Sequence, residues 1–123
     1  MIVKKDFINA IYQDIEMVRG DTMTFNFELQ GLEGQTPDNI IFSCAEHYDD
    51  EPLFTADLSE GITLEEYDEV KDVAIYSVRI IPSKTSILDL NRYYYDLELT
   101  INEDVITLMR GRLTLLYEVT KGV

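Results

Sequence analysis

Alternating apolar and polar residues between Leu90 and Val119 form the strongest pattern in the chain. In an extended strand, one face of the first half would carry Tyr93, Tyr95, Leu97, Leu99 and Ile101, which is the period of a half-buried strand. Residues 102–104 have turn chemistry, so the return strand from Val105 to about Val119 should pair antiparallel with the first. The apolar phase of the return strand changes once, and we expect a β-bulge at Arg110-Gly111-Arg112, where glycine tolerates the required backbone angles.

The same alternation predicts five further strands, separated by segments rich in glycine, proline and acidic residues. They cover residues 14–18, 22–29, 40–47, 53–58 and 73–81. Residues 65–72 are charged and lack apolar anchors, which indicates an exposed loop or hairpin tip, and residues 83–88 can form one helical turn between two sheets. About seven strands in this arrangement predict an all-β fold, an immunoglobulin-like antiparallel β-sandwich with Greek-key crossing.

Tyr93 gives a more specific indication of this fold. It begins the penultimate strand directly after a crossing connection, where immunoglobulin-like domains place a tyrosine corner whose hydroxyl bonds to upstream backbone. The cysteine pair and core tryptophan of antibody domains are absent from the sequence. The expected likeness is therefore one of architecture.

Residues 1–13 differ from the sandwich predicted for residues 14–123, and we interpret them as a short N-terminal arm. Their apolar residues mix helical and extended spacing, so a short helix and an extended arm both fit; these residues are Ile2, Val3, Phe7, Ile8, Ile11 and Tyr12. Leaving that surface in water would cost roughly 25 cal/mol per Å² relative to burial. The arm should therefore pack on the domain or dock on a neighbouring protein, and in the second case deleting residues 1–12 would abolish assembly without changing the melting temperature.

A second candidate interface lies at the start of the strand that opens the hairpin. Tyr93 and Tyr95 should face the core, which leaves Tyr94 on the outer face beside Arg92. Tyrosine and arginine are enriched in protein–protein interfaces, although a single exposed tyrosine is also common on any protein surface.

Charge narrows the choice of partners. The 123 residues include 24 acidic and 10 basic side chains, giving a formal net charge of −14, and the acidic residues concentrate between Glu46 and Asp72. Such a field repels phosphate backbones and anionic lipids, so we expect no nucleic-acid and no membrane partner. The acidic stretch favours simple solubility first and a basic partner second. No apolar signal region or membrane-length segment is present, which predicts a protein made in the cytoplasm and carried elsewhere only by a larger particle.

The candidate chemistry is sparse. His47 is the single histidine, Cys44 is the single cysteine and lies in an apolar run, and no nucleophile elbow or phosphate-binding glycine loop occurs. We therefore predict no enzyme, no cofactor and no metal site. Two other functions are left open: a calcium-dependent adhesion module using the acidic loops, and a free ligand- or carbohydrate-binding sandwich, against which the absence of tryptophan counts. The Arg19-Gly20-Asp21 tripeptide is explained by a turn between two strands.

Two parts of the chain resemble a known family. The run 18–29, VRGDTMTFNFEL, opens a predicted core strand, and the run 91–100, NRYYYDLELT, pairs with 105–113, VITLMRGRL. They are similar to the immunoglobulin-like modules of tailed-bacteriophage virion proteins, such as the N-terminal domain of baseplate upper proteins and related tail, fibre and head-attached proteins. In that family an R/K-G-D-T run opens a core strand, and a G-x-Y-x-Y-x-L strand pairs with a V-x-T-L-x-x-G-x-L strand. Asn91 replaces the usual glycine, and asparagine also accepts left-handed backbone angles.

The resemblance covers about half of the chain. It implies a non-enzymatic structural component of a virion, attached to the head, neck, tail, baseplate or fibre. Its expected partners are other virion proteins and copies of itself, and it brings no catalytic residues or cofactor.

Overall fold

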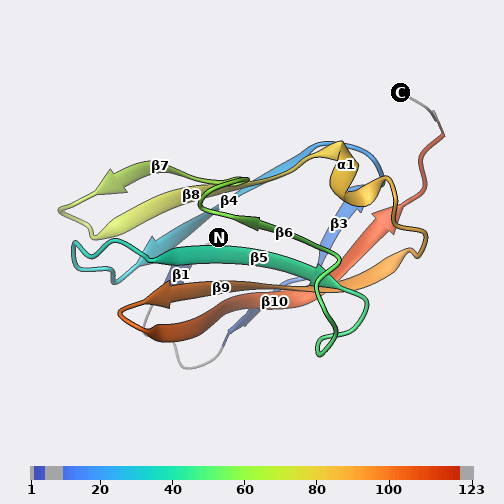
Figure 1. The fold of residues 1–123 in the computed structure, drawn as a ribbon. Helices are drawn as coiled ribbons and strands as arrows, with labels where there is room; N and C mark the ends of the chain where they lie inside the picture. Colours follow the sequence, from blue (N-terminus) through green and yellow to red (C-terminus); the bar gives the residue numbers. More distant parts are fainter. Residues whose placement is uncertain (1, 5–9, 120–123) are drawn as a thin grey trace.

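Two β-sheets packed face to face make up the computed structural model, which describes residues 2–4 as backbone and residues 10–119 with their side chains (Figure 1). The first sheet has the strand order β1-β4-β8-β7, with β1 (Ile2–Lys4), β4 (Met23–Gln30), β7 (Ile62–Asp68) and β8 (Val73–Ile80). The second has the order β2-β10-β9-β5-β6, with β3 also paired to β10. Its strands are β2 (Ile11–Tyr12), β3 (Ile15–Val18), β5 (Asn39–Ala45), β6 (Phe54–Asp57), β9 (Arg92–Ile101) and β10 (Asp104–Leu116).

The chain passes from one sheet to the other after β1, β3, β4, β6 and β8, and the helical turn α1 (Pro82–Thr85) lies in the last of these crossings. The strand orders β4-β8-β7 and β3-β10-β9-β5-β6 are those of an immunoglobulin-like Greek key. The predicted fold class is therefore confirmed. The strands exceed the expected number of about seven because β1 and β2 are too short to show a period and β7 is mostly polar and exposed.

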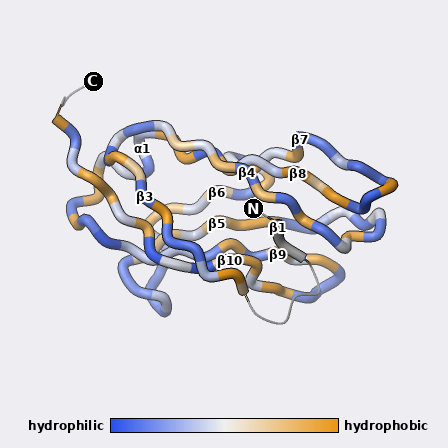
Figure 2. Tube along the Cα trace, turned by 180° about the vertical axis from the view of Figure 1, so that it is seen from behind, coloured by the Kyte–Doolittle hydropathy of each residue, from blue (hydrophilic) through white to orange (hydrophobic). Residues whose placement is uncertain are grey.

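The core is filled from one face of each long strand. On β9, Tyr93, Tyr95, Leu97, Leu99 and Ile101 are all at most 3% exposed, and the intervening residues reach water, as predicted. Phe42 of β5 lies at the centre of the core, with its ring stacked on Tyr95 at 5.2 Å and on Phe54 at 6.2 Å between centroids. The alternation of hydrophobic and hydrophilic positions can be followed along the strands in Figure 2. Because one face of each long strand fills the core, the side chains on the opposite face can contact solvent or a partner.

The tyrosine corner is present. The backbone N–H of Leu90 donates a hydrogen bond of 2.9 Å to the Tyr93 hydroxyl oxygen, three residues upstream of that side chain. This bond joins the connection after α1 to the start of β9. The prediction of an immunoglobulin-like corner from position alone is confirmed.

The turn of the hairpin is also confirmed, but its bulge lies elsewhere than predicted. Asn102 and Glu103 both have positive φ, at 50° and 70°, so they form a two-residue turn. The register of β9 and β10 shifts between Thr107 and Met109, not at residues 110–112. Leu108 and Met109 are consecutive and both buried, and this is the point where the apolar phase changes. The predicted bulge at Arg110-Gly111-Arg112 is therefore wrong. Gly111 lies instead where the backbone of Gln13 comes too close for a Cβ atom.

The N-terminal segment is extended where it is described, and it contacts both sheets. β1 pairs in parallel with β4, and β2 pairs in parallel with β10. The helical alternative is therefore wrong for residues 2–4 and 11–12. The expected boundary at residue 13 falls between β2 and β3, which pair with the same strand β10.

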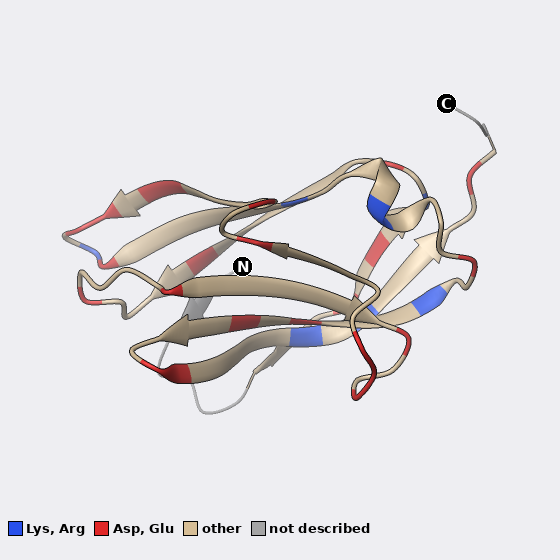
Figure 3. Ribbon diagram, viewed as in Figure 1, with Lys and Arg blue, Asp and Glu red and all other residues tan. Residues whose placement is uncertain are grey.

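Residues 65–72 were expected to form a loop or hairpin tip, and only the second half does so. Residues 65–68 belong to β7, which pairs antiparallel with β8, and residues 69–72 turn the chain. β7 is an edge strand whose side chains, apart from buried Ile62 and partly buried Asp68, face water. Ile62 anchors its start in the core, and backbone pairing with β8 holds the remainder. Acidic residues mark this edge and the hairpin ends in Figure 3.

Candidate protein-binding face

Three tyrosines and two arginines gather on the outer face of the six-stranded sheet. Strand register places Tyr94 of β9 opposite Arg112 of β10, and Arg110 of β10 opposite Tyr12 of β2. Tyr48 joins them from the loop between β5 and β6. We call Tyr12, Tyr48, Tyr94, Arg110 and Arg112 the tyrosine–arginine face. Tyr94 points outward because its two neighbours on β9 point into the core.

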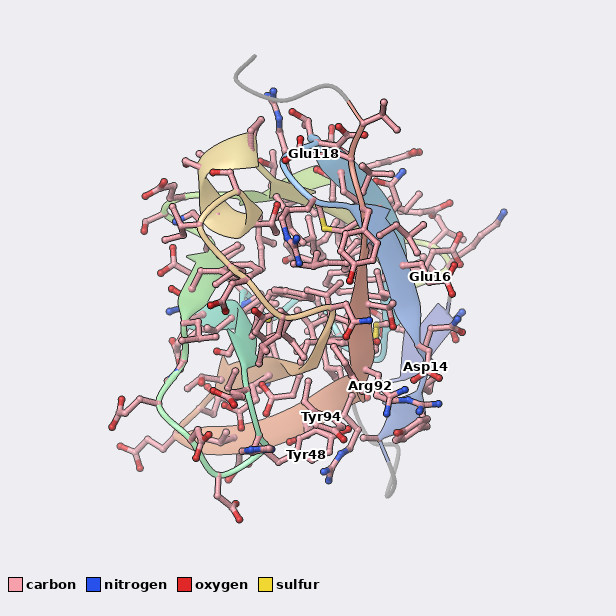
Figure 4. The ribbon with its side chains drawn as sticks, turned by 90° about the vertical axis from the view of Figure 1, so that its right-hand side faces the viewer. Asp14, Glu16, Tyr48, Arg92, Tyr94 and Glu118 are labelled. Atoms are coloured by element: carbon pink, nitrogen blue, oxygen red, sulfur yellow. The ribbon has the colours of Figure 1, made fainter. Side chains whose placement is uncertain are left out.

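Aromatic and cation–π contacts hold the loop over residues 46–53 against this face. The rings of Tyr48 and Tyr94 are 4.6 Å apart between centroids, and they lie together in Figure 4. The Arg110 guanidinium carbon is 4.1 Å from the Tyr48 ring centroid, and the His47 ring is 6.5 Å from that of Tyr94. Burial raises the pKa of Tyr48, and neighbouring Tyr12 adds to the rise. Tyr48 nevertheless stays 39% exposed and Tyr12 61% exposed, so both present ring surface to water.

Asp14 fixes Arg112 at the border of the face. The Arg112 backbone N–H donates to Asp14 Oδ1 at 3.0 Å, and its guanidinium donates to Oδ2 at 3.2 Å. The backbone hydrogen bond from Arg112 lowers the pKa of Asp14, and the guanidinium acts in the same direction. Asp14 stands where the chain passes from β2 to β3 (Figure 4), so the ion pair also orders that junction.

A cavity of about 160 Å³ opens beside the tyrosines, between the 46–53 loop and the outer face of β5 and β9. Its walls are formed by Ser43, Ala45, His47, Tyr48, Asp50, Pro52, Tyr94, Tyr95, Asp96 and Glu98. Burial raises the pKa of Asp96, the charge of Glu98 raises it further, and Arg110 opposes the shift. The cavity is thus an aromatic and acidic recess in a face that is otherwise partly basic.

The interface residues predicted from the sequence fall into separate places. Tyr94 and Tyr12 belong to the tyrosine–arginine face, and exposed Arg92 lies two positions before Tyr94 on the same side of β9. Ile11 is partly buried against the core instead of free for a partner. Ile2 and Val3 are described as backbone of β1 in the other sheet, and Phe7 and Ile8 lie outside the described residues.

Sequence reasoning missed Tyr48, Arg110 and Arg112 as members of this face. Arg110 and Arg112 flank Gly111 at a spacing of two, so they would have been found on one side of the return strand had the bulge been placed correctly. Tyr48 lies in a loop, where no periodicity indicates the direction of a side chain.

The other chemistry-bearing residues have structural surroundings. Cys44 is fully buried, and burial raises the pKa of its thiol to about 12, so the thiol stays protonated and is a poor nucleophile. In the Arg19-Gly20-Asp21 turn between β3 and β4, the Arg19 guanidinium donates to the Leu90 carbonyl and the Gly20 N–H donates to Thr85 Oγ1 at 2.9 Å. Within residues 10–119, no three His, Cys, Asp or Glu side chains are grouped so that they could hold a metal ion.

No protein-family model matches this sequence, and no protein of curated function matches it either. The described part of the chain contains no helix that is long and apolar enough to cross a membrane.

Proposed function

We propose that this chain is a non-enzymatic structural protein of a bacteriophage particle, an accessory or adaptor subunit attached to the head, neck, tail, baseplate or fibre. The tyrosine–arginine face carries the proposal. Tyrosine and arginine are enriched in interfaces and at their energetic hot spots. Here five such residues gather on one outer sheet face of a protein that has only 10 basic side chains.

The face is already ordered in the isolated chain, which favours binding. Tyr48 packs on Tyr94 and under Arg110, and Asp14 holds Arg112. Side chains that are ordered before binding lose less conformational entropy when a partner arrives. Tyrosine adds large contact area with few rotatable bonds. A partner protein would therefore meet a largely preformed surface.

The phage assignment is supported by the likeness of residues 18–29, 91–100 and 105–113 to immunoglobulin-like modules of virion proteins. The proposed partners are other virion structural proteins and copies of this chain. The net charge of −14 disfavours direct contact with nucleic acid or anionic membranes. The protein would be made in the host cytoplasm and end in the particle.

Two tyrosines of nearly equal exposure provide a matched test. Tyr48, 39% exposed, belongs to the tyrosine–arginine face, whereas Tyr67, 38% exposed, lies on β7 of the other sheet. Particles of the phage that encodes the chain should contain the wild-type protein at a fixed copy number by mass spectrometry. In a deletion strain supplied with variants, Tyr67→Ala should be incorporated and Tyr48→Ala should be lost from particles.

Thermal melts of the purified variants provide the control for folding, and both should melt within a few degrees of wild type. The proposal would be overturned if the wild-type chain were absent from purified particles. Equal incorporation of the two folded variants would refute the role of this face.

A further inference from the structure

The cavity beside Tyr48 and Tyr94 has a size that limits its occupant. Its volume of about 160 Å³ is well below the roughly 300–1,000 Å³ of pockets that enclose drug-sized ligands. Its lining includes the aromatic residues Tyr48, Tyr94 and Tyr95, together with Ser43 and Ala45 of β5. Such a recess suits the end of one long side chain better than a whole small molecule.

The walls of the cavity carry three carboxylates, and none of them forms an ion pair with another described side chain. Asp96 and Glu98 are two positions apart on β9, so both project from the same outer side, and Asp50 faces the cavity from the loop. Arg110 is opposite Asp96 in the register, but its guanidinium lies over the Tyr48 ring. Among the residues with described side chains, the ion pairs are Asp14–Arg112 and Glu60–Lys84, and neither involves a cavity residue.

Among the described side chains, Asp96 lines the cavity without an ion-pair partner. The carboxyl is partly buried, and both its burial and the neighbouring Glu98 raise its pKa despite Arg110. A cation placed beside this carboxylate would stabilise its charged form, which burial destabilises. The aromatic rings beside it favour the same kind of ligand through their electron-rich faces.

We propose that this cavity is a socket for an arginine side chain presented by the partner protein. A guanidinium group can donate two parallel hydrogen bonds to a carboxylate and can stack on a tyrosine ring at the same time. It is also less strongly hydrated than a lysine ammonium, so it enters a partly dry recess at lower cost. The socket lies beside the tyrosine–arginine face, so one partner could contact both. The inference rests on the proposed function and deepens it, since it names the chemistry that the partner presents.

A short peptide pair tests the socket directly. The full ¹⁵N-labelled chain is titrated with acetyl-Gly-Arg-Gly-amide and with the same peptide carrying citrulline, which has nearly the shape of arginine without its charge. The arginine peptide should cause saturable amide shifts in residues 43–45 and 94–98, and the citrulline peptide should cause none. Asp96→Asn should weaken binding roughly tenfold or more, because a charge-assisted hydrogen bond is lost.

Glu66→Gln is the matched control, since it removes one exposed negative charge from β7 in the other sheet. It should leave the affinity within about twofold. A melt of Asp96→Asn should show a midpoint at or above that of wild type, because a carboxyl with a raised pKa is replaced by a neutral group of the same shape. If that variant failed to fold, Glu98→Gln would take its place in the titration.

The socket would be refuted by equal binding of the two peptides, by absent saturation, or by equal loss of affinity in Asp96→Asn and Glu66→Gln. The last result would mean general attraction to an acidic protein. The proposed function and the socket can fail separately. A chain that is absent from particles but binds the arginine peptide refutes only the function. A chain whose incorporation depends on Tyr48 but which binds no arginine peptide refutes only the socket.

Discussion

Replacing Gly111 with alanine should push β2 and β3 away from β10, the strand with which both of them pair. A Cβ atom at this position would stand 2.2 Å from the carbonyl oxygen and 2.8 Å from the carbonyl carbon of Gln13. Both contacts are with backbone, so no side-chain rotation can relieve them. The chain at Gln13, between β2 and β3, would have to move away from β10 by more than 1 Å to reach an ordinary contact distance, which is about 3.5 Å or more between heavy atoms.

Three hydrogen bonds depend on that close approach. The Gln13 N–H donates to the Arg110 carbonyl at 2.9 Å, the Tyr95 hydroxyl donates to the Gln13 carbonyl, and the Arg112 N–H donates to Asp14 at 3.0 Å. At about 1 kcal/mol each, with about 1–3 kcal/mol for overpacking, Gly111→Ala should lose about 4–6 kcal/mol of unfolding free energy. That is a large part of the roughly 5–15 kcal/mol that stabilises a typical domain.

Gly34→Ala provides the control, because no atom lies within 4 Å of its added Cβ. Gly34 has φ of +79°, so alanine there should lose only the roughly 1–2 kcal/mol of left-handed backbone strain. Differential scanning calorimetry should show a drop of about 12–30 °C for Gly111→Ala, at about 3–5 °C per kcal/mol, and at most about half as much for Gly34→Ala. Hydrogen exchange should speed up at Gln13 and Arg112 before the β9–β10 hairpin is affected. If Gly111→Ala melted no lower than Gly34→Ala with its Gln13 amide protected, the close-approach argument would be refuted.

Three further predictions follow from the core and its tyrosines. Leu97→Ala should lose about 2–5 kcal/mol in chemical denaturation, whereas Glu98→Ala, on the outer side of the same strand, should lose little; equal losses would contradict the register. Tyr93→Phe should lose about 1–2 kcal/mol because the Leu90 N–H is left without its partner, and an unchanged denaturation midpoint would show that the corner bond contributes nothing. Burial raises the pKa values of Tyr93, Tyr95 and the Cys44 thiol, so the unfolded chain loses these protons at lower pH than the folded one. The free energy of unfolding should therefore be constant below about pH 9 and fall above it, first as unfolded Cys44 ionises near 9 and then as the unfolded phenols ionise near 10. A flat pH profile up to about 11 would contradict this.

The parts of the fold that sequence predicted well are those where burial imposes a period. β9 alternates without a fault over ten residues, and the tyrosine corner follows from the position of Tyr93. β1 and β2 escaped prediction because strands of two or three residues have no measurable period. β7 escaped it because an edge strand facing water needs backbone pairing more than apolar side chains.

The candidate site shows a different limit. Tyr94 could be assigned to the outer face from alternation, but its companion Tyr48 comes from a loop, and loop direction is set by tertiary contacts such as that with Arg110. The sequence pattern indicates that position 111 requires glycine, but the requirement comes from the close approach of Gln13 and not from a bulge. A glycine that allows a bulge and one that allows a neighbouring backbone to approach are indistinguishable in sequence, since both reflect only the lack of a side chain.

The parallel pairing of β3 with β10 determines how the domain would respond to mechanical force. β3 lies near the N-terminal end of the chain and β10 near the C-terminal end, and they pair over four residue positions from Ile15↔Leu113 to Val18↔Leu116. In a parallel pair, a pull on the start of β3 and the end of β10 drags the two strands past one another along their length.

The hydrogen bonds between β3 and β10 would then carry the load together, whereas a hairpin pulled at its open end breaks its bonds one at a time. The Asp14–Arg112 ion pair stands at the start of this ladder and shares the load. Tension applied between Ile15 of β3 and Leu116 of β10 would therefore be resisted by the whole strand pair at once.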